Sequence, residues 1–235
     1  MSWKQILLVS LAILLGWGGT AQAGGSAVFE ARDESMHGGA ERMDVHWSGG
    51  DRLRVSHEGG YTLYRDGHVY MVHASNGKPE VYDLQAMMQQ MQGMQPGGGA
   101  VQGGFGETLV KARKTGRTEV VAGLRGEVHE VTVRWEKGEE TRELVLSRDP
   151  AVVELTRAWI GMLTRISPDT DGSEESLESY LVRHKAGLLR FGDDMRLVSL
   201  DRTEPDPALF ELPAPPRQMP DLRQRMPAGA APSYP

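Results

Sequence analysis

The sequence predicts an α+β protein built on a large, curved, mostly antiparallel sheet of about 10–11 strands, with helices packed on its concave face. Three observations predict this fold. Short segments alternate apolar and polar residues and are separated by glycine-containing turns, as the strands of hairpins are. Helical patterns are inserted between groups of strands instead of following each strand. A sheet of this size curls, so we expect an unclosed half-barrel with a space beneath the helices.

The first 23 residues have the pattern of a secretory signal peptide. Lys4 supplies one positive charge, an apolar run covers residues 6–17, and Ala21-Gln22-Ala23 is an A-x-A cleavage sequence. An uncleaved membrane anchor is the alternative, but a spanning helix needs about 20 apolar residues and this run is shorter. We therefore expect cleavage after Ala23, a soluble periplasmic protein and no transmembrane segment in the mature chain.

Composition limits the classes of function. The chain has 235 residues and no cysteine, so it can neither form disulfides nor be acylated at a lipobox cysteine. Its formal net charge is −6, whereas a protein that binds nucleic acid needs a basic surface. Residues 24–212 suffice for a single domain with a hydrophobic core.

The opening strands are defined by a residue period of two. Residues 27–32 are predicted as the first strand, and residues 43–75 form a meander broken at Gly49-Gly50, Gly59-Gly60 and Asp66-Gly67. The alternation places apolar side chains on one face of this meander and polar ones on the other. The residues assigned to the apolar face include Trp47, Leu53, Val55, Leu63 and Met71.

The rest of the chain adds helices and a second group of strands. After Asn76-Gly77 the period changes, and residues 80–92 are predicted as an amphipathic helix. A second helix is opened by Asp149-Pro150 and ended by Ser167-Pro168, since proline is tolerated in a first turn. A third covers residues 173–186. The remaining predicted strands are residues 109–114, 118–122, 127–135, 141–147, 188–191 and 195–200.

Two segments have compositions that oppose regular structure. Residues 93–106 are rich in glycine, so we expect a flexible loop. Nine of the 13 prolines lie between Pro205 and Pro235. Because proline cannot donate a sheet's hydrogen bonds, residues 213–235 are predicted to be a disordered tail.

The sequence carries no catalytic signature. It has no G-x-S-x-G or S-x-x-K motif, and its glycine runs lack the Lys-Ser/Thr of a phosphate loop. His57 and His129 lie in predicted strands without a second histidine at zinc-binding spacing, so we interpret both as solvent-facing. The acidic loop at Asp169 has its glycine at the fourth position instead of the sixth that an EF-hand requires. These absences predict a protein that is not an enzyme and has no cofactor.

Four methionines form a conspicuous cluster at Met87, Met88, Met91 and Met94. Thioethers bind Cu(I), and a histidine such as His68 or His73 could complete such a site. Alternatively, these adaptable side chains fill an irregular core or line an apolar groove. Met87 and Met91 share a helical face while Met88 lies about 100° away, which favours the core or groove.

Two blocks of sequence resemble the LolA/LolB-like superfamily of outer-membrane lipoprotein carriers. They are DRLRVSHEGGYTLYRDGHVYMVHASNGKPEVYDL at residues 51–84 and MRLVSLDRTEPDPALFELPAPP at residues 195–216. The resemblance implies an unclosed β-barrel capped by helices, and it is nearest to uncharacterised periplasmic members of that group. The methionine-rich helix, the glycine-rich segment and the proline-rich tail depart from the carrier pattern.

The predicted layers would enclose one set of apolar side chains. An ordinary packed core is one interpretation of this set. The functional interpretation is that part of the space stays open for an apolar ligand, a lipid or an acylated partner. A copper-binding protein and a structural envelope module with a partner-binding tail are the alternatives. The predicted ligand-contacting residues are Trp47, Leu53, Val55, Leu63, Met71, Leu84, Met88, Met91, Val133, Trp135, Leu155, Trp159 and Met162.

Overall fold

The computed structural model describes residues 24–32, 40–57, 59–92, 108–135, 138–166 and 176–217. The predicted signal peptide, the glycine-rich segment 93–106 and residues 218–235 of the predicted tail lie outside these ranges. The first described strand begins at Gly24, the residue that follows the predicted cleavage position.

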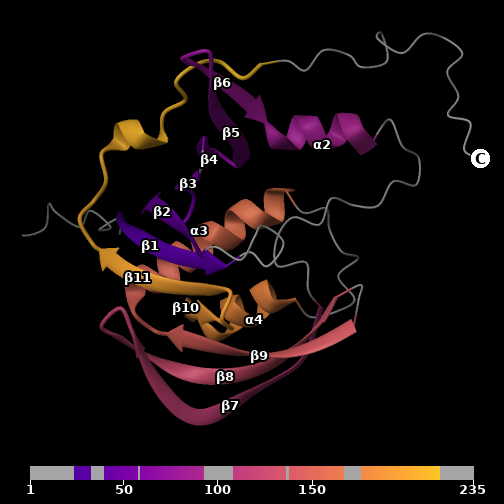
Figure 1. Cartoon of the computed structure of the whole chain (residues 1–235), viewed down its shortest axis with the longest axis vertical. Helices are drawn as coiled ribbons and strands as arrows, with labels where there is room; N and C mark the ends of the chain where they lie inside the picture. The colour runs from indigo at the N-terminus through magenta and orange to yellow at the C-terminus, as the bar shows by residue number, and fades with distance from the viewer. Residues whose placement is uncertain are drawn as a thin grey trace, which may run out of the picture.

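The described strands form one antiparallel, unclosed sheet of 11 strands, which confirms the predicted α+β half-barrel. In Figure 1 the strands follow an arc from β6 at one end to β7 at the other. Their order is β6-β5-β4-β3-β2-β1-β11-β10-β9-β8-β7. The bounds are β1 Gly24–Arg32, β2 Ala40–Ser48, β3 Leu53–His57, β4 Gly60–Arg65, β5 His68–Ser75, β6 Lys78–Asp83, β7 Thr108–Val121, β8 Leu124–Trp135, β9 Gly138–Ser147, β10 Gly187–Phe191 and β11 Met195–Asp201.

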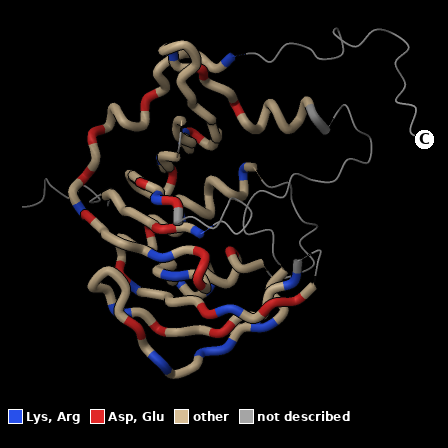
Figure 2. Tube along the Cα trace, viewed as in Figure 1, with Lys and Arg blue, Asp and Glu red and all other residues tan. Residues whose placement is uncertain are grey.

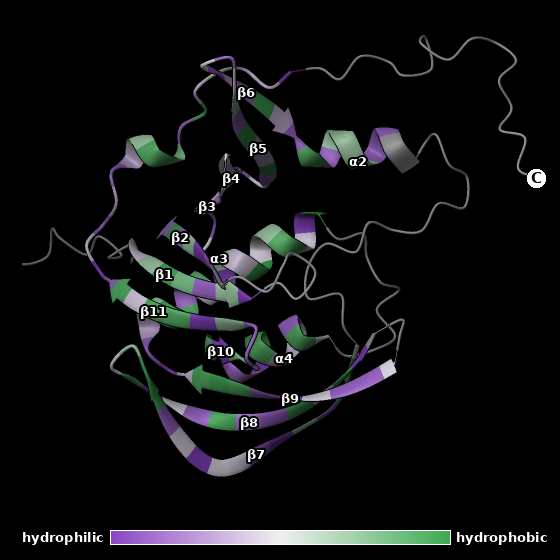
Figure 3. Cartoon of the chain, viewed as in Figure 1, coloured by the Kyte–Doolittle hydropathy of each residue, from purple (hydrophilic) through white to green (hydrophobic). Residues whose placement is uncertain are grey.

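Three described α-helices accompany the sheet: α2 Leu84–Gln92, α3 Pro150–Ile166 and α4 Leu177–His184. Figure 1 shows α3 and α4 on the inner side of the arc, and Figure 3 shows hydrophobic residues on both. None of the described helices combines the length and apolar character that crossing a membrane requires. The third helix is shorter than predicted because Ser176 caps its N-terminus and Lys185 ends it in a left-handed conformation.

The start of α2 corrects the prediction of a helix over residues 80–92. Lys78–Asp83 is a strand, β6, paired with β5 through a turn in which Asn76 and Gly77 have φ of 53° and 73°. An Asn-Gly turn of this kind matches the twist of a hairpin and requires strands on both sides. The helix begins only after Asp83, whose carboxylate accepts the backbone N–H groups of Gln85 and Ala86.

A second correction concerns β7, which was predicted as two strands separated at Gly116. It is one strand of 14 residues whose register with β8 shifts between Lys114 and Thr118. Gly116, with a φ of 78°, belongs to this bulge. The Thr115 hydroxyl donates to the Val128 carbonyl, so the two strands stay joined across the irregularity.

The contact between α3 and β10 fixes the helix on the concave face. Gly187 lies so close to α3 that a Cβ there would be 2.4 Å from the carbonyl carbon of Val152. One turn further along, the Thr156 hydroxyl accepts the backbone N–H of Leu188 at 2.9 Å. Glycine therefore allows close backbone packing at this crossing, and the threonine satisfies an otherwise buried donor.

The convex face is crossed by the segment after β11, which we call the C-terminal strap (residues 202–217). Figure 1 shows it running outside the arc from β11 to β6. It contains a 3-10 helix, η1 Pro207–Phe210. Arg54 donates to the Leu209 carbonyl and Arg65 to the Phe210 carbonyl. The strap includes the first residues of the predicted tail, and its last backbone contact runs from the Arg217 N–H to the Val81 carbonyl on β6.

Both end strands of the sheet are met by backbone from elsewhere in the chain. Arg217 bonds to the edge of β6, and Ser176 forms an isolated bridge with Thr108 of β7. Figure 2 shows basic and acidic residues interspersed along β7 to β9.

Candidate functional site

Six of the 13 predicted ligand-contacting residues are buried in the layer between the sheet and the helices. Trp47, Leu53 and Val133 are 0 % exposed. The buried side chains of the set are Trp47, Leu53, Val55, Val133, Leu155 and Met162, and the half-buried ones are Met71, Leu84, Met88 and Trp159. Leu63 is buried elsewhere, as described below. The side chains of Met91 and Trp135 are outside the described part of the chain.

Leu63 was wrongly assigned to this layer. It is paired with Arg54, whereas Leu53 is paired with Tyr64. Directly paired residues share a face, so Leu63 lies with Arg54 on the convex side, where the strap passes. The error comes from the hairpin: His57 is paired with Gly60, so the inward-facing positions change from odd to even residue numbers between β3 and β4.

The concave layer retains one small apolar opening, which we call the crevice. It has a volume of about 20 Å³ and an almost entirely apolar lining between α3, α4 and the strands β1, β10 and β11. Trp159 contacts Phe29 there edge to face, with ring centroids 5.9 Å apart. The lining residues are Phe29, Leu155, Thr156, Trp159, Ile160, Leu181, Leu188 and Met195, of which Leu155 and Trp159 were predicted. The predicted cavity is therefore nearly filled within the described part of the chain.

A larger opening of about 320 Å³, which we call the edge hollow, lies between β7 and α4. It is lined by residues 109–114 of β7 and by Tyr180, Arg183 and His184 of α4. Of the basic residues on this strand, Lys114 is paired with the inward-facing His129, whereas Lys111 and Arg113 are paired with Thr132 and Glu130 on the opposite face of the sheet. The sequence pattern did not predict this opening because it depends on α4 lying beside β7.

Beneath the edge hollow lies a polar network centred on His129. The Tyr180 hydroxyl is 2.7 Å from His129 Nδ1, and the Glu127 carboxylate is 3.6 Å from His129 Nε2. One ring nitrogen of His129 therefore shares a hydrogen bond with the Tyr180 hydroxyl, and the other lies at ion-pair distance from the Glu127 carboxylate. Lys114 in turn pairs with Glu127 at 2.7 Å. Burial is the largest influence on the pKa of His129 and lowers it, although Glu127 opposes the shift.

The prediction that His129 faces solvent is wrong, because only 3 % of the residue is exposed. Its position two and four residues before the buried Val131 and Val133 is the signal that places it inward. Tyr180 and His184, four residues apart on α4, complete the cluster with ring centroids 4.1 Å apart.

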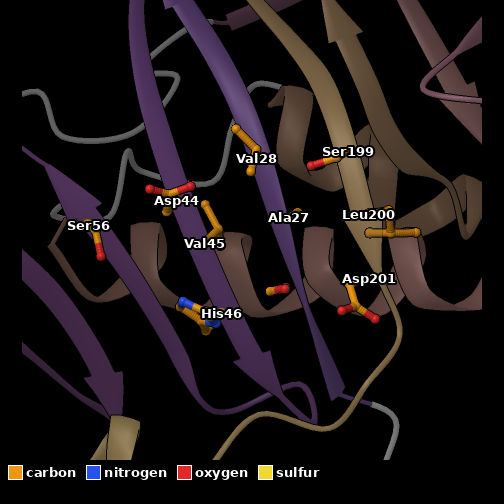
Figure 4. Close-up of a pocket in the computed structure, with 10 residues that line it drawn as sticks. Ala27, Val28, Asp44, Val45, His46, Ser56, Ser199, Leu200 and Asp201 are labelled. Carbon is orange, nitrogen blue, oxygen red and sulfur yellow. The ribbon is translucent and has the colours of Figure 1, made fainter.

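A third opening, of about 300 Å³, lies against strands β11, β1, β2 and β3. Figure 4 shows Asp44, His46, Ser56 and Asp201 projecting from separate positions along these strands. Burial lowers the pKa of His46, and Arg54 lowers it further. The polar groups are dispersed, and no hydrogen bond among the described residues links His46 to Ser56 or Asp44 as nucleophilic catalysis would require.

Metal binding receives no support from the described residues. His68 is 3.1 Å from Asp83, and His73 is 3.4 Å from Glu80. The two histidines are an odd number of positions apart on β5, so they face opposite sides of the sheet and cannot join one methionine site. No group of three His, Asp or Glu side chains within the described ranges is arranged to hold an ion.

No protein-family model matches the chain, and neither does any curated protein or any solved structure.

Proposed function

We propose that this chain is a non-enzymatic periplasmic binding protein for an apolar ligand, a lipid or an acylated partner, held between the sheet and helices α3 and α4. The crevice is the observation that carries the proposal, because its lining is apolar and includes the half-buried Trp159 and Met195. The half-barrel shape and the resemblance of residues 51–84 and 195–216 to lipoprotein carriers also support it.

The crevice must enlarge to accept an acyl chain, since a volume of about 20 Å³ has room for only about one water molecule. Helix α4 is the element that can make this room. It has eight residues and buries only Leu177, Tyr180 and Leu181. Helix α3, in contrast, has 17 residues and is fixed to β10 at Gly187 and Leu188. Movement of α4 away from α3 would open the crevice, and apolar area buried on the ligand at roughly 25 cal/mol per Å² would offset the lost contacts.

A direct test is titration of the purified chain from Gly24 onward with a fluorescent fatty acid, together with mass spectrometry of lipid extracted from it. We expect saturable binding that Ile160→Phe weakens, because Ile160 lines the crevice and a larger side chain would fill it. Leu163→Phe is the matched control on the same helix, since Leu163 packs against the core but does not line the crevice. Failure of the unaltered protein to bind any apolar probe would reject the proposal.

A further inference from the structure

The first residue after the predicted cleavage position lies beside a carboxylate. Glu204, in the C-terminal strap, packs on Gly24 at the start of β1, where an added Cβ would be 2.6 Å from the carboxylate carbon. The Gly24 nitrogen is bonded to the same Cα at about 1.46 Å, so it lies within about 5 Å of this carboxylate, and rotation of the glutamate side chain can close that gap. We propose that Glu204 binds the α-ammonium group that cleavage after Ala23 creates on Gly24.

Cleavage changes the charge at this position. Hydrolysis of the Ala23–Gly24 peptide bond, by one water molecule and the protease that removes the signal peptide, leaves a carboxylate on Ala23 and an amine on Gly24. An α-amino group has a pKa of about 7.7–8.0, so the amine takes up a proton at neutral pH, whereas the amide nitrogen of the uncleaved chain is uncharged. The ion pair with Glu204 therefore belongs to the mature protein alone. It does not depend on the apolar ligand.

The start of β1 is held in place by close packing. A Cβ added to Gly25 would overlap the backbone carbonyl oxygen of Asp201 and lie 2.5 Å from the ring of Trp47, which is 0 % exposed. Gly24 and Gly25 are also paired with Ser48 and Trp47 of β2. Glycine permits this approach, so the terminal nitrogen of the mature chain is positioned by its neighbours.

Glu204 is oriented toward this terminus by its own contacts. The Ser48 hydroxyl donates to Glu204 Oε1 at 2.7 Å, and Oε2 lies beside Gly24. Two residues earlier, Arg202 pairs with Asp149 at 2.8 Å, which ties the beginning of the strap to the start of α3. Glu204 forms no ion pair with a basic side chain of the described ranges. The α-ammonium would supply that cation.

A second carboxylate near this terminus also favours a cation. Glu154 lies on α3, and its Oε2 is buried without a hydrogen bond from any described residue. Burial has the largest effect on the pKa of Glu154 and raises it, Trp47 and Arg157 lower it, and the nearby Glu204 raises it again. The two carboxylates thus repel each other, and a positive charge beside them would reduce this repulsion.

The first test measures the pKa of the Gly24 α-amino group by NMR titration of the chain from Gly24 onward, prepared with isotopically labelled glycine. We expect a pKa about 0.5–1 above the ordinary 7.7–8.0, because the folded state favours the charged form. Glu204→Gln should return it to the ordinary value. Glu211→Gln is the matched control, because it removes the same charge from the strap at a residue that pairs with Arg65 of β4. N-terminal sequencing of the exported protein should identify Gly24 as its first residue.

The second test measures stability against pH. Because the folded state raises the pKa of the α-amino group, its contribution is present below about pH 7.7 and is lost as the pH rises through the folded-state value. Carboxyl and guanidinium groups ordinarily titrate outside pH 7–9.5, and burial lowers the pKa of His46, on the neighbouring β2, from its usual 6.5. The charged groups on the elements around this terminus are His46 on β2, Glu204 and Arg202 in the strap, Asp149, Glu154 and Arg157 at α3, and Asp201 on β11.

The comparison is between the chain from Gly24 onward and the same chain acetylated at Gly24. We expect acetylation to lower the melting temperature by about 1–4 °C at about pH 7 and to have no effect at about pH 9.5. In the Glu204→Gln variant acetylation should make no difference at either pH, since the partner is already absent.

Three results would overturn the proposal: an α-amino pKa that Glu204→Gln leaves unchanged, equal stability of the free and acetylated chains at about pH 7, or an exported protein that begins at another residue. Each leaves the apolar-ligand function standing, because fatty-acid titration tests that function separately.

Discussion

Replacing Gly187 with alanine tests the close contact on which the concave face depends. The new Cβ would lie 2.4 Å from the Val152 carbonyl carbon and 2.6 Å from its oxygen, whereas ordinary contacts begin at 3.4 Å. The first turn of α3 would have to move by about 1 Å, and these atoms are backbone, so no side-chain rotation relieves the overlap. Overpacking of this kind costs about 1–3 kcal/mol, and we expect a loss near 2 kcal/mol after the gain of about 0.4–1 kcal/mol from restricting the unfolded chain.

Thermal and urea unfolding measure this change directly. A loss of about 2 kcal/mol in a chain of this size lowers the melting temperature by about 4–8 °C. Gly50→Ala is the control, because its Cβ would meet only the flexible Arg157 side chain, at 3.3 Å. Thr156→Val leaves the Leu188 N–H without its acceptor, and combined with Gly187→Ala it should cost less than the sum, since both loosen one contact. Equal melting temperatures for Gly187→Ala and Gly50→Ala would refute the close approach of α3 to β10.

Three further changes probe other parts of the molecule. Phe210→Ala should lower the free energy of unfolding by about 3–5 kcal/mol, because Phe210 belongs to the strap and only 2 % of it is exposed; a loss below about 1 kcal/mol in urea unfolding would contradict that packing. Arg190→Met should cost about 1–3 kcal/mol, because it leaves the Glu119 and Glu143 carboxylates without a shared partner; unchanged stability would show that the network contributes nothing. Burial lowers the pKa of His129 below its value of 6.5 in the unfolded chain, so the unfolded state takes up the proton first as the pH falls. Stability should then decrease below about pH 6.5 by at most about 1.4 kcal/mol per pH unit, and a His129→Gln variant that keeps the full slope of the unaltered protein would refute this assignment.

The fold could be predicted because strand periodicity and turn residues are local signals. The breaks at Asp66-Gly67 and Asn76-Gly77 are hairpin turns in which all four residues have positive φ. The error over residues 80–92 arose where two local signals competed: apolar spacing favoured a helix, but the Asn-Gly turn required a strand after it. Residues 78–83 form a strand because pairing with β5 provides hydrogen-bond partners for the backbone groups of β6.

The candidate site was less predictable because it depends on how elements pack. Trp159 and Leu155 could be assigned to the crevice from the apolar stripe of one helix. The other crevice residues come from β1, β10, β11 and α4, and no local pattern relates those elements to one another. The edge hollow escaped prediction for the same reason. Tyr180 meets His129 only because α4 lies against β8, 51 residues away in the sequence.

The two bordered edges of the sheet have a consequence for aggregation. An unclosed sheet exposes terminal strands on which a foreign chain can add, and continued addition leads to fibre-like growth. Here the Arg217 N–H bonds to the Val81 carbonyl of β6, and Ser176 forms a bridge with Thr108 of β7. The residues Lys111, Arg113 and Lys114 also place positive charge along β7. Charges on an edge strand oppose the approach of another strand. The chain can thus leave its barrel open toward the helices and still discourage the self-association to which open sheets are prone.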